Sequence, residues 1–273
     1  MLRSLDDLKH YAIHASDGDI GHVKDFYFDD EGWAIRYFVV DTGGWLLGRK
    51  VLITPISVIK SDWSNKALSV GITAEQVKNS PDINTDKPVS RQHEYEYLGY
   101  YGYPMYWGGA GLWGEGIYPD MMMPGYPGYP HSYAGGINHA LSEADERREI
   151  DDSHLRSCQE VTGYNIIATD GEIGHVSGML LDDETWAIRY LIVDTSNWWL
   201  GSKVLIAPLW IDQIEWPGKQ VTVNLTRQAI KDAVVYDVGM TFDREKEIAI
   251  HRHYDRVGYW EREEKNEKMD TRD

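Results

Sequence analysis

The sequence predicts a mainly β protein: two small six-stranded β-barrels in tandem, each followed by short helical segments and joined by a linker rich in Gly, Pro and Tyr. Three observations support this fold. The chain repeats itself after 153 positions, so that Asp17–Val23 aligns with Asp170–Val176. Each copy holds short runs of β-branched and aromatic residues that are separated by turn residues. Between the copies, the composition shifts towards Gly, Pro and Tyr, which favours a linker.

The internal repeat sets the expected domain boundaries. Without a gap, Trp33–Tyr37 aligns with Trp186–Tyr190, and Lys50–Ile53 aligns with Lys203–Ile206. A repeat of about 100 residues has the size of a whole domain rather than of a solenoid unit. We therefore expect a first domain at residues 1–107, a linker at 108–153, a second domain at 154–260 and a charged tail at 261–273.

The first copy shows six candidate strands, each ended by a turn signal such as Asp17-Gly18 or by a proline such as Pro55. They are Tyr11–Ala15, Ile20–Phe28, Trp33–Asp41, Arg49–Thr54, Ser57–Trp63 and Ala67–Val70. Alternate residues of Trp33–Asp41 are apolar on both faces, so this strand is expected at the centre of the sheet. A closed barrel would leave no free edge in so small a domain.

Two short helices are expected after the strands. Thr73 and Gln76 have the spacing of a capping box, which predicts a helix that stops before Pro81. The second copy keeps Thr226 as the N-cap but has no Gln or Glu three residues later. A further helix is predicted over Asp243–Arg256.

The composition excludes some classes of partner and of site. The chain carries 27 Lys and Arg against 44 Asp and Glu, a net charge of −17. Such a charge repels phosphate backbones, so nucleic acid is not an expected partner. The single cysteine, Cys158, excludes an intrachain disulfide and a multi-cysteine metal site. We see no secretory signal and no apolar run of about 18 residues, so we expect a cytoplasmic protein without an integral membrane segment.

The motif strings resemble the PRC-barrel domain. In the first copy they are Gly21, Asp29-Asp30, Trp33–Tyr37, Val40–Thr42 and Val51–Pro55, and the second copy repeats them between Gly174 and Pro208. The resemblance covers residues 5–80 and 158–233 and implies a six-stranded barrel with a short helix in each. The family includes the cytoplasmic domain of the purple-bacterial reaction-centre H subunit and the C-terminal domain of the ribosome maturation factor. His251–Tyr254 and Gly258–Trp260 resemble the tails of soluble two-barrel members.

The resemblance leaves three hypotheses for function, because one fold hosts many activities. The first is a non-enzymatic module for protein interaction or assembly, whose two barrels pair like a homodimer. Each half, expressed alone, would then fold and self-associate. The second is an accessory to a photosynthetic or electron-transfer membrane complex. The third is a small-ligand binder that uses a groove between the barrels. Nucleophile, phosphate-loop and zinc motifs are absent from the sequence, so we expect neither an enzyme nor a cofactor.

Four pairs of equivalent residues are candidate interaction or structural positions: His22 and His175, Trp33 and Trp186, Arg36 and Arg189, and Asp41 and Asp194. The histidines could serve a metal or a proton relay, but solvent-facing strand positions are favoured. The arginines could bind an anionic ligand, but an ion pair with an acid of the same barrel is favoured. The aspartates are expected to accept from N–H groups of the following turn.

Three further patterns have a structural and a functional interpretation. Asp29–Glu31 lacks the spacing of a Ca²⁺ loop and favours a β-turn. His251 and His253 would share a face only on a strand, and we expect a helix there. The aromatic stretch Tyr100–Trp107 could bind a partner, but packing against its own barrel is favoured, as for Tyr254, Tyr259 and Trp260. The stretch after Trp107, which includes Gly125–Pro130, has no counterpart in the second copy, and its role stays open.

Overall fold

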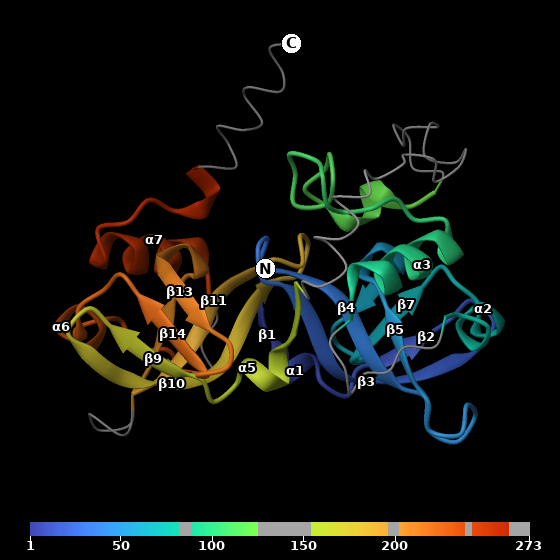
Figure 1. Ribbon diagram of the computed structural model, residues 1–273, viewed down its shortest axis with the longest axis horizontal. Coiled ribbons are helices and arrows are strands. Elements are labelled where there is room, and N and C mark those ends of the chain that lie inside the picture. Colours follow the sequence, from blue (N-terminus) through green and yellow to red (C-terminus); the bar gives the residue numbers. More distant parts are fainter. Residues whose placement is uncertain (82–88, 125–153, 196–201, 238–241, 262–273) are drawn as a thin grey trace, which may run out of the picture. The chain divides into compact units, whose positions relative to one another are not determined.

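The computed structural model describes residues 1–81, 89–124, 154–195, 202–237 and 242–261 (Figure 1). Most of the expected linker, residues 125–153, and nearly all of the expected tail lie outside the described residues. The chain divides into two compact units. The N-terminal unit comprises residues 3–161 and 181–188, and the C-terminal unit comprises residues 1–2, 162–180 and 189–273. The N-terminal unit therefore takes residues from both repeats.

The N-terminal unit contains a mostly antiparallel sheet of seven strands. Six of them follow the order β5-β4-β3-β2-β7-β6, and β8 pairs with β3 off this path. Their bounds are β2 (Ala12–His14), β3 (Asp19–Asp29), β4 (Ala34–Asp41), β5 (Lys50–Ile53), β6 (Val58–Asp62), β7 (Ala67–Val70) and β8 (Leu155–Ser157). The short strand β1 (Leu2–Ser4) precedes them. All six expected strands of the first copy are thus present, with ends within about two residues of the prediction.

The C-terminal unit repeats this topology. Its path is β12-β11-β10-β9-β14-β13, within a sheet that also counts seven strands. The bounds are β9 (Asn165–Ala168), β10 (Gly171–Asp182), β11 (Ile188–Asp194), β12 (Lys203–Ile206), β13 (Ile211–Glu215) and β14 (Gln220–Val223). The prediction of two tandem β domains with few short helices is confirmed.

The prediction of closed six-stranded barrels is wrong, because among the described residues each sheet has seven strands and its strand order does not close on itself. Among the described residues of the N-terminal unit, no pairing joins β5 to β6, the two ends of the strand order. A 3₁₀ turn, Pro55–Ser57, separates these strands. The carbonyl of Leu52 in β5 accepts a hydrogen bond from the Tyr97 hydroxyl (2.9 Å), so a helix rather than a strand covers this end of the sheet.

Strands β3 and β4 form the long antiparallel pair at the centre, with Phe26 opposite Phe38 and Tyr27 opposite Tyr37. Every residue of β4 from Ala34 to Val40 is buried, as the apolar character of both faces predicted. Gly21 lets the two strands cross closely at one end. Its φ is +152°, and a Cβ there would overlap the carbonyl oxygen of Asp41. Only glycine fits this approach.

The helices follow the capping signals. Helix α2 (Ala74–Lys78) begins at Thr73 with both hydrogen bonds of the capping box, and α6 (Arg227–Lys231) keeps only the Thr226 cap. Helix α7 (Arg244–His253) has Asp243 as its N-cap and lies inside the predicted segment. The other α-helices in the described residues are α1 (Leu5–Leu8), α3 (Arg91–Tyr101) and α5 (Cys158–Val161). Within the described part of the chain, no helix is long and apolar enough to cross a membrane.

Candidate functional site

A segment of the second repeat completes the sheet of the N-terminal unit. Strand β8 lies antiparallel to the end of β3, with Tyr27 opposite Ser157 and Asp29 opposite Leu155. The tip formed by residues 181–188 belongs to the same unit. We call the contact of residues 154–161 and 181–188 with the first repeat, inside this unit, the repeat interface.

Two equivalent tryptophans lie at the centre of the repeat interface. Ile188 N–H donates to Trp33 O (2.6 Å), and Ile35 N–H donates to Trp186 O (2.9 Å). The second bond is the counterpart of the first, with the roles of the two repeats interchanged. Both lie beside an antiparallel bridge between Ala34 and Ala187. The Trp186 ring packs on Phe38 with centroids 4.8 Å apart, and Trp33 packs on Phe28 at 5.1 Å. The candidate tryptophans therefore serve contact between the repeats.

Two equivalent ion pairs flank the tryptophans. Arg3 Nε lies 2.6 Å from Asp183 Oδ2, and Arg156 Nε lies 2.8 Å from Asp30 Oδ2. Arg3 and Arg156 are related by the repeat, as are Asp30 and Asp183. In one pair the arginine comes from the first repeat, and in the other it comes from the second. The interface therefore has local two-fold character.

Asp25 breaks this symmetry. Its Oδ2 accepts from the Ser157 hydroxyl (2.5 Å), and its Oδ1 accepts from Gln159 N–H (3.1 Å). The side chain is buried, and burial raises its pKa although these hydrogen bonds act in the opposite direction. The second repeat has Gly178 at the equivalent position. Nothing in the sequence pattern singled out Asp25, except that the repeat differs there.

Arg36 is fully buried beneath the aromatic segment that follows α3. It donates to Asp29 Oδ2 (2.9 Å) and to the carbonyl of Leu112 (2.8 Å), and its guanidinium lies 3.9 Å from the Tyr106 ring centroid. Burial would raise the pKa of Asp29, but the charge and hydrogen bond of Arg36 outweigh it and lower the pKa. Arg36 thus forms the ion pair with an acid of the same repeat that was favoured, and it is shielded from solvent, although its Nε has no hydrogen-bond partner.

The segment at residues 108–124, expected to lie in the linker, packs on this site. Trp113 is buried, its Nε1 donates to Thr185 O (2.9 Å), and its ring stacks under the Arg36 guanidinium at 4.5 Å. The segment therefore connects the first repeat to the 181–188 tip within the N-terminal unit. The 3₁₀ turn Pro119–Met122 ends its described part.

A buried carboxylate lies beside Arg36 and was missed in the sequence. Glu94 in α3 accepts from Tyr106 (2.5 Å) and Tyr37 (3.2 Å) at Oε1, and from Arg91 (3.3 Å) at Oε2. Burial raises its pKa to about 7, against the opposing effect of Arg91 and the two tyrosines. The repeat register of Glu94 with Glu247 was the available signal, but a glutamate on a polar helix gives no sign of burial.

The C-terminal unit contains the equivalent carboxylate. Glu247 accepts from Tyr259 (2.7 Å) and Tyr190 (3.2 Å) at Oε1 and pairs with Arg244 (2.9 Å). Burial raises its pKa as well. His251 lies beside it and bonds the Tyr190 hydroxyl (3.0 Å), and burial lowers the pKa of this histidine. The same polar cluster thus fastens α3 and α7 to their own sheets.

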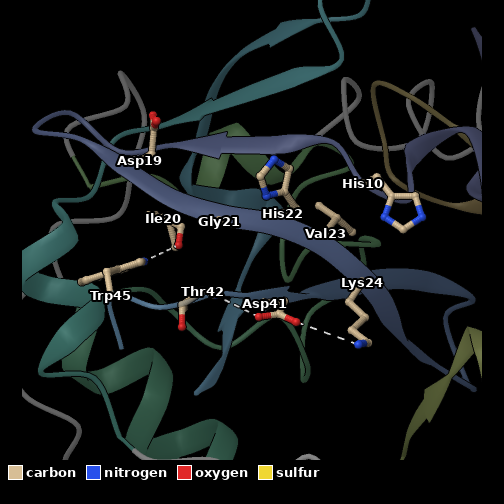
Figure 2. Close-up of a pocket in the computed structure, with 11 residues that line it drawn as sticks. His10, Asp19, Ile20, Gly21, His22, Val23, Lys24, Asp41, Thr42 and Trp45 are labelled. Carbon is tan, nitrogen blue, oxygen red and sulfur yellow. Dashed lines mark hydrogen bonds and ion pairs between the residues drawn. The ribbon is translucent and has the colours of Figure 1, made fainter. Parts of the chain in front are cut away.

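A surface pocket of about 580 Å³ holds two other candidate residues, His22 and Asp41 (Figure 2). His22 is exposed on β3, as favoured. Asp41 Oδ1 accepts from Gly43 N–H (2.9 Å), which confirms its expected role in the following turn. Asp41 Oδ2 lies 3.9 Å from Lys24 Nζ, and Trp45 closes one side by donating to Ile20 O (2.6 Å).

The remaining candidates lie in the C-terminal unit. His175 is half-buried on β10, Arg189 lies 3.9 Å from the Tyr259 ring centroid, and Asp194 ends β11. Gly174, which precedes His175, lies against the backbone of Asp194. Within the described ranges, no group of three or more His, Cys, Asp or Glu is arranged to hold a metal. Helix α7 directs His251 inward and leaves His253 exposed, as the helical prediction required.

Two other patterns follow their structural interpretation. Glu31 N–H donates to Asp29 Oδ1 (3.0 Å) and Trp33 N–H to Asp29 O (2.8 Å), so Asp29–Glu31 forms the expected turn. Tyr106, Tyr254 and Tyr259 are buried against their own units, as favoured for the repeated aromatics. Cys158 is buried, and burial raises the pKa of its thiol.

Comparison with known proteins identifies the family of the first repeat. Residues 3–64 match the family model of the PRC-barrel domain, which confirms the resemblance there. The second repeat is linked to it through the internal sequence match. An uncharacterized protein of Deinococcus radiodurans is 34% identical over 82 residues, which cover 30% of this chain and 29% of that protein. The chain thus matches less than a third of the length of this relative.

Proposed function

We propose that this protein is a non-catalytic module for protein interaction and assembly, in which PRC-type repeats bind one another through the repeat interface. The observation that carries the proposal is the position of β8 and of the 181–188 tip, which the N-terminal unit takes from the second repeat. A separate chain bearing the same segments could occupy the same face.

The chemistry of the repeat interface supports binding between proteins. Trp186 is buried against Phe38 at its centre, and the partly exposed pairs Arg3–Asp183 and Arg156–Asp30 lie around it. A buried aromatic anchor with a polar rim is the usual anatomy of a binding hot spot. Addition of β8 to β3 supplies backbone hydrogen bonds, as in other interactions that extend a sheet.

The proposal is tested by cutting the folded chain between the repeats. A protease site inserted after Gly136 would give an N fragment and a C fragment. We expect the two to co-elute as a one-to-one complex at micromolar concentration in size-exclusion chromatography with light scattering. Separation of the fragments on cleavage would contradict the assembly function.

A matched pair of tryptophan variants locates the binding energy. Trp186→Ala removes the buried ring at the centre of the interface, and we expect it to weaken the nicked complex at least tenfold, or about 1.4 kcal/mol. Trp45→Ala removes a ring that is 41% exposed in the same unit and should leave the affinity unchanged. Equal affinities for both variants, measured by fluorescence anisotropy, would contradict the assignment.

A second candidate function is the binding of a small polar ligand, which the pocket of Figure 2 favours. His10, His22 and Lys24 line it with Asp41 and the Trp45 indole. A metabolite screen by thermal shift would identify ligands whose stabilisation is lost in Trp45→Ala. A screen without such a ligand leaves assembly as the function.

A further inference from the structure

We propose that the C-terminal unit binds a tryptophan-bearing peptide segment of a partner protein. The surface that binds it, which we name the second aromatic face, consists of Arg189, Arg244, Tyr259 and Trp260. The proposal stands on a comparison inside this chain, because the N-terminal unit covers the equivalent face with its own segment at residues 108–124. It adds a binding surface to the proposed assembly function, and it can be wrong while the repeat interface still assembles the chain.

The two repeats build this face in the same way. The Arg189 guanidinium lies 3.9 Å from the Tyr259 ring centroid. The equivalent guanidinium of Arg36 lies 3.9 Å from the Tyr106 ring centroid. Each tyrosine hydroxyl donates to the buried glutamate on the neighbouring helix of its own unit. The two faces differ in exposure, since Arg36 is buried whereas Arg189 is partly exposed.

A second arginine on each face shows the same difference. Arg244 lies 4.5 Å from the Trp260 ring centroid, and the equivalent Arg91 lies 4.3 Å from the Trp107 ring centroid. The side chain of Arg244 is 49% exposed, whereas that of Arg91 is 8% exposed. The arrangement of arginines and rings is therefore kept in the second repeat, whereas the shielding from water is not.

The first repeat shows which chemistry fits such a face. Arg36 Nη1 donates to Leu112 O (2.8 Å), and its guanidinium lies 4.5 Å from the Trp113 ring centroid. The covering segment turns on itself there, because Gly111 N–H donates to Gly114 O (2.7 Å). A guanidinium contacts aromatic rings through its plane and oxygen acceptors through its N–H groups. The matching ligand for the second aromatic face is therefore a turn that carries a tryptophan next to a backbone carbonyl.

The sequence of the second repeat provides no equivalent cover. The repeat register places Lys265 and Asn266 where the first repeat has Leu112 and Trp113. Residues 261–273 are mostly charged and contain neither tryptophan nor glycine. The segment that follows the second repeat thus lacks the residues with which the first repeat covers its face, and a partner protein supplies them.

A synthetic peptide with the sequence of residues 108–120 tests the proposal on the full chain. Isothermal titration calorimetry should show saturable binding of one peptide per wild-type chain, because the first face is already covered. The same peptide with Trp113→Ala should bind at least about tenfold more weakly, since a buried tryptophan is the usual anchor of such a contact. A wild-type chain that binds no peptide, or binds both peptides equally, would overturn the proposal.

Variants of the full chain locate the binding surface. Arg189→Gln removes the guanidinium that holds the tryptophan ring, and binding should weaken at least about fivefold. Arg244→Gln changes a more exposed side chain and should also weaken binding, so that the test survives if Arg189→Gln fails to fold. Arg252→Gln, at an exposed arginine of α7 outside the face, is the matched control and should bind like the wild type. Binding that neither face variant weakens would place the peptide elsewhere and overturn the proposal.

Trp113→Ala in the chain itself provides a positive control, because it uncovers the first face. This variant should bind a second peptide. One peptide bound by the variant and none by the wild type would restrict this chemistry to the first face and overturn the proposal. Binding that requires removal of residues 262–273 would assign the second aromatic face to the chain's own tail and overturn it as well. Co-elution of the nicked fragments tests the assembly function separately from all of these outcomes.

Discussion

At the scale of residues, the least expected features are carboxylates held inside the protein by tyrosines and arginines. Glu94 and Glu247 each receive two tyrosine hydroxyls and pair with an arginine three positions earlier on the same helix. The carboxylates thereby join each helix to its sheet. Their burial makes the stability of the protein depend on pH.

Glu94→Gln tests this dependence. Because the pKa of Glu94 is raised from 4.5 to about 7, the folded state binds its proton more tightly than the unfolded state. The contribution of Glu94 to the free energy of unfolding therefore falls as pH rises from 4.5 to 7, by on the order of 3 kcal/mol. Urea unfolding of the wild type and of Glu94→Gln should diverge across this range. Glu96→Gln, an exposed control on the same helix, should follow the wild type.

Arg36→Met tests the buried ion pair between Arg36 and Asp29. It leaves Asp29 without its cation in a dry site, and breaking a buried pair in this way costs about 3–5 kcal/mol. We expect a matching loss in the free energy of unfolding. Adding Asp29→Asn removes the stranded charge and should restore part of the loss. A double variant no more stable than the single one would show that packing of Arg36 on Tyr106 and Trp113 is the larger effect.

At the scale of elements, the approach of β3 to β4 depends on one glycine. Gly21→Ala would place a Cβ against the backbone of Asp41, which cannot move without breaking the strand pairing. We expect a loss of about 3 kcal/mol or more, since both overlap and an unfavourable φ contribute. Gly18→Ala is the control, because nothing lies within 4 Å of a Cβ there. Equal unfolding temperatures for Gly21→Ala and Gly18→Ala would contradict this account.

Elements with strong local signals could be predicted from the sequence. Short runs of β-branched and aromatic residues between turn signals predicted β2 to β7, and the Thr73–Gln76 capping box predicted α2. Helix α3 was missed because its sequence, Arg91–Tyr101, is polar and aromatic without an apolar stripe. Strand β8 was missed because three residues carry no periodicity, and its pairing with β3 is fixed by contacts far along the chain.

The candidate site could be predicted only in part, for the same reason. Arg36 pairs with an acid and Asp41 accepts from a turn N–H, as their residue types favour. Trp33 and Trp186 were singled out as repeated aromatics, but their contact depends on which segments the folding brings together. Asp25 and Glu94 gave no local signal, because burial of a charge is decided by tertiary packing.

At the scale of the whole molecule, the reciprocal ion pairs of the repeat interface should act together. Arg156→Asp would oppose Asp30 and weaken the nicked complex severalfold, as charge repulsion at a partly exposed pair requires. Asp30→Arg in the same chain should recover most of the affinity by reversing the pair. Failure of the reversal to recover binding, in the same anisotropy assay, would mean that Arg156 acts through its packing instead.

The pairing of β8 with β3 also determines the order in which parts of the N-terminal unit can fold. During synthesis, the first repeat leaves the ribosome well before residues 154–161 and 181–188, which complete its unit. At about 5–20 residues per second, the surface around Phe38 and Tyr27 stays uncovered for roughly 6 to 30 seconds. We expect this interval to be the period in which the nascent chain is most exposed to chaperones and to neighbouring copies on the same messenger RNA.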